Sequence, residues 1–140
     1  MPKPDVSTLR PPAFVEGFRV FTDPANPGIE IPIRLRVRKS VSKDFALQAK
    51  VRGLMQDYIT GRDGGPAGKF IVNGERVEVT PQLCSTAAIL STYEVPDEGE
   101  AAYTPLDWFG LSETMPSLME EVLEMYVDLE QQAKVQAKNS

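Results

Sequence analysis

An alternation of apolar and charged residues between positions 29 and 38 constrains the fold of this chain more than any other feature. A period of two is typical of a β-strand with one buried face and one exposed face. The apolar face comprises Ile29, Ile31, Ile33, Leu35 and Val37, and the other face carries Arg34, Arg36 and Arg38. Because Pro32 lacks an N–H group, we expect this strand at a sheet edge or with a bulge there.

Two other strand signals flank a helical pattern. Residues 18–22 suit a short strand that ends in a proline- and glycine-rich turn. The Asn-Gly pair at 73–74 predicts a hairpin over residues 70–79, because a type I′ turn needs positive φ at both central positions. Between these strands, apolar residues at helical spacing predict a helix that begins at Lys43 and ends at Gly61.

The second half of the chain carries helix signals only. Thr80 before Pro81, and Thr104 before Pro105, each provide a capping hydroxyl and a proline in the first turn, so each pair predicts a helix start. A last helix is expected over residues 116–137, where apolar residues are spaced three and four apart. Strands followed by helices indicate an α+β fold with a small antiparallel β portion and three to four helices.

Length and composition place this fold in one domain. The chain has 140 residues, of which 41% are hydrophobic and 25% are charged, as in an ordinary globular domain. We expect residues 14–140 to form that domain and the proline-rich residues 1–13 to form an extended tail. No apolar run approaches the ~20 residues of a membrane-spanning helix, and a single cysteine suits a reducing cytoplasm.

The chemistry available to the chain is narrow. It contains no histidine and one cysteine, which excludes Ser-His-Asp and Cys-His catalysis and the common zinc sites. The glycine-rich residues 61–69 lack the spacing of a phosphate-binding loop, and the acidic residues 94–100 lack the spacing of an EF-hand. Carboxylates such as Glu120 and Glu124 share one helix face, but nothing in the sequence buries them. We therefore expect no enzyme activity, no cofactor and no metal ion.

Charge is distributed unevenly along the chain. Residues 1–80 hold 13 Lys and Arg against 9 Asp and Glu, a net charge of +4. Residues 81–140 hold 2 against 11, a net charge of −9, so the whole chain carries −5. Two interpretations follow: the acidic half is the solvated face of C-terminal helices, or it pairs with the basic half within one chain or between chains.

Two sets of residues are candidates for binding. Arg34, Arg36 and Arg38 could contact phosphates along one strand face, so a nucleic-acid-binding or regulatory module is one alternative. Few aromatic residues accompany them for base stacking and the chain is acidic overall, so a solvated edge strand is the simpler interpretation. Trp108 and Phe109 lie near a short loop, where they either anchor an interface or pack in the core.

The order of these features resembles a known family. Thr80-Pro81 opens a helix, an acidic loop follows, residues 103–111 (YTPLDWFGL) open the next helix, and Met115-Pro116 precedes an acidic terminal helix. In layout, size and acidity, residues 15–137 resemble the small tail assembly chaperones of long-tailed bacteriophages and prophages. Another virion component, such as a head–tail connector, is an alternative.

The resemblance implies a non-enzymatic protein of the bacterial host cytoplasm. Members of the family bind the tape measure protein, keep it in solution and recruit tail tube subunits; many self-associate. A partner helix would lie in an apolar groove between helices, unless the same side chains simply bury the last helix on its own domain. The residues expected to line that groove, with Trp108 and Phe109 beside them, are Leu118, Met119, Val122, Met125, Tyr126 and Leu129.

Overall fold

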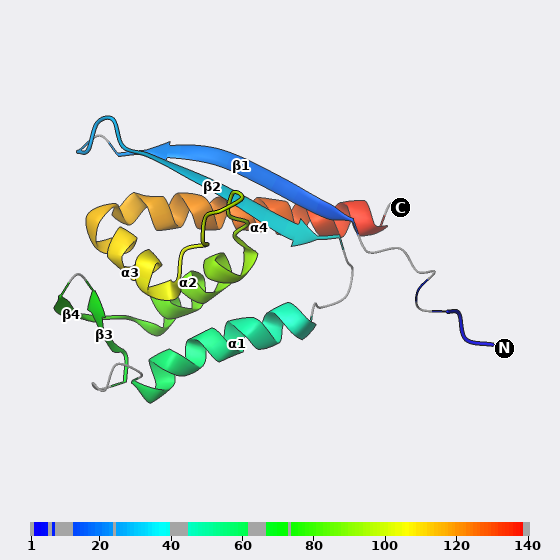
Figure 1. Ribbon diagram of the computed structural model, residues 1–140, viewed down its shortest axis with the longest axis horizontal. Helices are drawn as coiled ribbons and strands as arrows, with labels where there is room; N and C mark the ends of the chain where they lie inside the picture. Colours follow the sequence, from blue (N-terminus) through cyan, green and yellow to red (C-terminus); the bar gives the residue numbers. More distant parts are fainter. Residues whose placement is uncertain are drawn as a thin grey trace.

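Two antiparallel strand pairs and four helices make up the described part of the chain, which confirms the expected α+β fold. The computed structural model in Figure 1 describes residues 2–5, 7, 13–23, 25–39, 45–61, 67–72 and 74–138. The elements are β1 (Phe14–Thr22), β2 (Glu30–Arg38), α1 (Phe45–Thr60), β3 (Lys69–Val72), β4 (Glu75–Glu78), α2 (Pro81–Tyr93), α3 (Pro105–Thr114) and α4 (Pro116–Lys138).

β1 and β2 form a long antiparallel hairpin in continuous register. The backbone N–H of Lys39 donates to the carbonyl oxygen of Ala13 at 2.9 Å. Because hydrogen-bonded pairs alternate along such a ladder, the odd-numbered residues of β1 bond to β2 and the even-numbered ones direct their backbone groups away from it. Pro32 pairs with Val20, so its missing N–H falls on the side away from β1. The predicted edge position is therefore confirmed.

The inner face of this hairpin packs on α4, along which it lies in Figure 1. Its buried side chains are Val15, Phe21, Ile31, Ile33, Leu35 and Val37. The predicted apolar face of the second strand is confirmed except at Ile29, which precedes the strand and is 51% exposed. The first strand was expected over residues 18–22 only. That start is wrong, because β1 already pairs with the end of β2 from Phe14.

The helix starts predicted at Thr80 and Thr104 are confirmed. The Thr80 hydroxyl accepts a hydrogen bond from the N–H of Leu83 at 3.1 Å, and Thr104 forms a capping box with Asp107. Both caps satisfy amides that the first helical turn leaves unpaired. The last helix, expected over residues 116–137, ends one residue later. In Figure 1, α2 and α3 lie on the side of α4 opposite the hairpin, so α4 is covered on both sides.

α1 and the short β3–β4 hairpin complete the fold. α1 packs against α2 and is followed, as predicted, by Gly61 in left-handed geometry with φ of 66°. The start predicted at Lys43 lies outside the described residues. The short hairpin turns through Gly74 with φ of 82°, as the Asn-Gly pair predicted. The ring of Tyr58 stacks on that of Phe70 at 6.4 Å between centres, which joins α1 to β3.

A close approach between β1 and α4 is testable at Gly17. A Cβ atom there would lie 2.9 Å from Cδ1 of Leu129. We expect Gly17→Ala to lower the free energy of unfolding by roughly 1–3 kcal/mol, because overpacking forces the strand or the leucine to shift. Urea denaturation measures this loss, and unchanged stability would contradict the close approach.

Gly53→Ala in α1 is the matched control. Among the described residues, no heavy atom outside its own helix backbone lies within 4 Å of the Cβ position. Alanine should raise the free energy of unfolding there by roughly 0.5–1 kcal/mol, because glycine loses more conformational freedom in a helix. The two substitutions are thus expected to have opposite signs.

Candidate functional site

The long hairpin presents a second face, here called the outer face, on the side opposite its buried residues. It consists of Phe14, Glu16, Phe18 and Val20 from β1, and Pro32, Arg34, Arg36 and Arg38 from β2. The three predicted arginines therefore lie together, but the register also brings two phenylalanines among them. Sequence reasoning missed Phe14 because it began the strand at position 18, and it missed the place of Phe18 because it did not predict the pairing of Phe18 with Arg34. The sequence of β1, FVEGFRVFT, does not alternate regularly between apolar and polar residues, so it carried no clear signal for this face.

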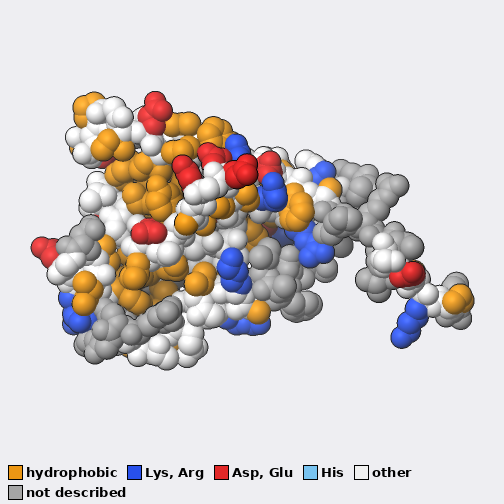
Figure 2. Space-filling view, in the orientation of Figure 1, with side chains coloured by type: hydrophobic (Ala, Val, Ile, Leu, Met, Phe, Trp, Pro, Cys, Tyr) orange, Lys and Arg blue, Asp and Glu red, His pale blue; other side chains and the backbone are white. Residues whose placement is uncertain are grey.

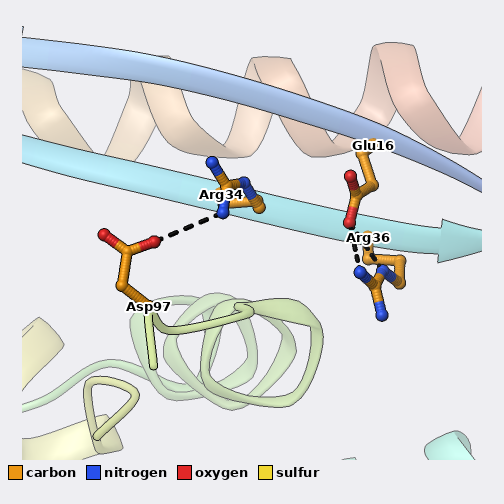
Figure 3. A network of polar contacts seen from close by, with 4 residues as sticks. All are labelled: Glu16, Arg34, Arg36 and Asp97. Carbon is orange, nitrogen blue, oxygen red and sulfur yellow. Dashed lines mark hydrogen bonds and ion pairs between the residues drawn. The ribbon is translucent and has the colours of Figure 1, made fainter. Parts of the chain in front are cut away.

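Two arginines of the outer face already have carboxylate partners, as Figure 3 shows. Nε of Arg36 donates to Oε1 of Glu16 at 2.7 Å, across the hairpin. Nη1 of Arg34 lies 3.3 Å from Oδ1 of Asp97, in the loop after α2. The basic and acidic halves of the chain therefore meet within one chain at this ion pair. Both ion pairs neutralise positive charge of arginines that the sequence analysis considered for contacts with phosphates.

The outer face also exposes large apolar side chains. Phe14 is 47% exposed, Phe18 is 54% exposed and Val20 is 42% exposed. The guanidinium carbons of Arg36 and Arg34 lie 5.5 Å and 5.0 Å from the ring centres of Phe14 and Phe18, within the range of cation–π attraction. In Figure 2, hydrophobic side chains gather over the hairpin beside paired positive and negative groups. Exposed apolar side chains gathered on one face are a common feature of interaction surfaces.

A cleft of about 420 Å³ separates one end of the outer face from the loop that joins α2 to α3. The N–H of Val95 donates to the carbonyl oxygen of Arg34 at 2.8 Å, which holds this loop against the edge of β2. The N–H of Tyr103 donates to Oε1 of Glu94 at 2.8 Å and closes the loop on itself. Apolar and charged groups line the cleft together: Phe18, Pro32, Arg34, Glu94, Val95, Pro96, Asp97, Glu100, Ala101 and Tyr103.

Burial at this cleft changes the acidity of Glu94. Loss of solvent raises the pKa of its carboxyl above the ordinary value, the hydrogen bond from Tyr103 opposes that rise, and the nearby charge of Asp107 adds to it. The carboxylate therefore fixes the loop at an electrostatic cost. At neutral pH this side chain stabilises the loop through its hydrogen bond, while the burial of its charge is unfavourable.

The residues predicted to line a partner groove lie in the core instead. Trp108, Phe109, Leu118, Met119, Val122, Tyr126 and Leu129 are all buried, and Met125 is half-buried. This placement corrects the expectation of an open groove along all of these positions, although Met125 and Leu129 line a smaller groove between α4 and β1. The physical reason is that the long hairpin covers one side of α4 while α2 and α3 cover the other. The alternative considered at the outset, that these side chains bury the last helix on its own domain, describes their positions.

The burial and hydrogen bonds of the remaining reactive side chains indicate structural roles. Cys84 is 2% exposed in the core. The phenol of Tyr126 donates a hydrogen bond to Glu130, and burial first, then that bond, raises its pKa far above the ordinary value. Within the described ranges there is no group of three or more Cys, Asp and Glu side chains that could hold a metal ion. No helix among these residues has the length and apolarity to cross a membrane.

Comparison with protein-family models, curated proteins and solved structures gives no match to this chain. A functional proposal therefore depends on the surfaces described above and on the layout of the sequence. Of those surfaces, the outer face combines exposed apolar area, neutralised charge and an adjoining cleft. We take it as the candidate site.

The raised pKa of Glu94 predicts a pH-dependent stability. A raised pKa means that the folded state binds the proton more tightly, so stability falls as pH rises from the ordinary carboxyl value of 4.5 through the raised one. Glu94→Gln keeps an acceptor for the N–H of Tyr103 and removes the charge. At pH 7 we expect this variant to be more stable than the native protein, by less than about 1 kcal/mol because the group is half-exposed.

Urea denaturation at pH 7 and pH 4 measures this effect. The difference between the two proteins should be smaller at pH 4, below the ordinary carboxyl value, because the Glu94 side chain then becomes mostly protonated. Glu98→Gln, an exposed change in the same loop, should leave stability unaltered at pH 7. A Glu94→Gln variant less stable than the native protein at pH 7 would show that the charge itself holds the loop.

Proposed function

We propose that this protein is a non-enzymatic tail assembly chaperone of a long-tailed bacteriophage or prophage, acting in the host cytoplasm by binding other proteins. The class comes from the resemblance in layout, from the capped helix at Thr80 to the acidic terminal helix. The binding surface, in contrast, is inferred from the fold. It is the outer face of the long hairpin, since most of the side chains expected to form a groove on α4 are buried.

The observation that carries this proposal is the row of half-exposed apolar side chains at Phe14, Phe18 and Val20. Phenylalanine offers large apolar contact area at a low cost in side-chain entropy, so such residues often anchor protein interfaces. Arg34 and Arg36 lie over the two rings and are themselves paired with carboxylates. A surface of this kind can hold an apolar partner without carrying a strong net charge of its own.

The partners follow from the class. The tape measure protein is the expected client, tail tube subunits are the expected recruits, and self-association is expected of the free chaperone. The exposed acidic residues of α4, among them Glu120, Glu124 and Asp128, would keep a complex with an apolar client in solution, because net charge opposes aggregation.

Co-expression with a tagged tape measure fragment tests the proposal. The native chain should co-purify with the fragment and increase its yield in the supernatant. A Phe14→Ser, Phe18→Ser double variant should reduce co-purification at least about tenfold, because truncation of an interface anchor typically costs 2 kcal/mol or more. Both side chains are half-exposed, so the variant should keep the native circular dichroism spectrum.

The matched control changes exposed apolar residues elsewhere. Val127 and Val135 on α4 are 55% and 49% exposed, and their double serine variant should co-purify as the native chain does. Equal co-purification by the native chain and the phenylalanine variant would contradict the role of the outer face. Failure of the native chain to bind the fragment would contradict the assignment to this class.

The nucleic-acid alternative makes a separate prediction on the same face. It requires binding of DNA or RNA that weakens with salt and weakens further in Arg36→Glu. We expect no such binding, because Arg36 is paired with Glu16 and Arg34 with Asp97. Fluorescence anisotropy with a labelled oligonucleotide at low and at physiological salt measures this. Salt-sensitive binding that weakens further in Arg36→Glu would favour the alternative over the chaperone.

A further inference from the structure

One edge of the long hairpin has unpaired backbone groups. The ladder bonds the odd-numbered residues of β1 to β2, so the N–H and C=O groups of Glu16, Phe18 and Val20 point to the opposite edge. None of the described residues forms a hydrogen bond with these groups. The corresponding edge of β2 differs, since Val95 bonds to Arg34 there and Glu94 forms a bridge with Leu35. The edge of β1 is thus the one that can accept another strand.

A groove of about 330 Å³ runs beside that edge, between β1 and α4. No residue of β2 contributes to it, so it opens on the side of β1 away from β2. Gly17, Met125 and Leu129 give it small and apolar surface. A strand added to β1 would lie about 4.8 Å from it and about 10 Å above the helix axis, at usual sheet and layer spacings. The groove is therefore where alternate side chains of an added strand would project.

The charge of the groove determines which side chains of an added strand would fit it. Glu121, Glu124 and Asp128 of α4 line it, and among the described residues none of the three forms an ion pair. Arg19 is the positive group of the lining, and Glu16 is engaged with Arg36. Side chains that enter the groove should accordingly be Lys or Arg. On the other side, the added strand would lie beside Phe14, Phe18 and Val20, where apolar side chains fit.

We propose that the edge of β1 binds, by antiparallel strand addition, an extended protein segment that alternates apolar and basic residues. Residues opposite Phe18 and its even-numbered neighbours would exchange backbone hydrogen bonds with β1 and place apolar side chains on the outer face. The residues between them would place ammonium or guanidinium groups over Glu121, Glu124 and Asp128. The inference deepens the proposed function, because it names the chemistry of the client segment that the outer face would hold.

A synthetic peptide tests the inference on the purified full chain. The probe is a labelled nine-residue peptide that alternates valine or threonine with lysine, and fluorescence anisotropy at low salt measures its affinity. A peptide with glutamate in place of lysine, and one of the same composition without alternation, should each bind at least about tenfold more weakly, a loss of about 1.4 kcal/mol. Equal affinity of all three peptides would overturn the proposal.

Backbone methylation separates strand addition from simple charge attraction. Methyl groups on the amide nitrogens of the apolar positions should abolish binding, because those amides would donate to β1. Methyl groups on the lysine amides, which would face solvent, should leave binding unchanged. Full affinity of both methylated peptides, or the reverse pattern, would overturn antiparallel addition at this edge.

Charge reversal locates the site on α4. A Glu124→Lys, Asp128→Lys double variant should weaken the lysine peptide at least about tenfold and strengthen the glutamate peptide, because like charges would now oppose the lysines. A Glu113→Lys, Glu120→Lys double variant is the matched control, since both residues are exposed, neither lines the groove and the change in net charge is the same. An equal loss in the control would mean that net charge, not the groove, attracts the peptide.

Two results distinguish this inference from the proposed function. If the tape measure fragment co-purifies through Phe14 and Phe18 but no peptide binds, the outer face is the site and the strand edge is not. If the alternating peptide binds but the fragment does not, the edge is a recognition site and the assignment to tail assembly fails. A stable dimer by sedimentation that excludes the peptide would show that a second copy occupies the edge, and would overturn the proposal.

Discussion

The packing of one face of a two-stranded hairpin on α4 is the interaction on which the rest of this structure depends. A lone hairpin is at best marginally stable in water, so β1 and β2 need the helix beneath them. Ile33 and Leu35 from the hairpin and Val122 from α4 are fully buried in that layer, and each such side chain contributes roughly 1.5–3 kcal/mol on burial. Only two strands form this sheet. Its opposite face and one strand edge therefore remain exposed.

What remains exposed determines the kind of function that the fold can support. The outer face combines apolar area with arginines that are already paired, while the groove beside β1 carries unpaired carboxylates of α4. Exposed ion pairs contribute little to stability, about 0–1 kcal/mol each. They offset positive charge that would attract phosphates, whereas the unpaired carboxylates of the groove can attract basic side chains. These features are the basis on which we propose protein partners for both surfaces.

Local features of this fold could be predicted from the sequence and long-range ones could not. The alternation over residues 29–38 and the caps at Thr80 and Thr104 depend on neighbouring residues, and they were predicted correctly except at Ile29. The position of Phe18 over Arg34 depends on the register of two strands, which the turn between them determines. The apolar stripe of α4 predicts that one face of the helix is buried, but it does not identify the element that packs on that face. Here the partner is the hairpin of the same chain.

Residue-resolved amide hydrogen exchange of the free protein tests the open hairpin edge most directly. The amides of the odd-numbered residues 15–21 bond to β2 and should exchange at least about 100-fold more slowly than those of the even-numbered residues 16–20, which face solvent. An alternating pattern along β1 is the predicted result. Uniform protection along β1 would mean that the edge is covered, and uniform fast exchange would mean that the hairpin does not form; either result would contradict the account.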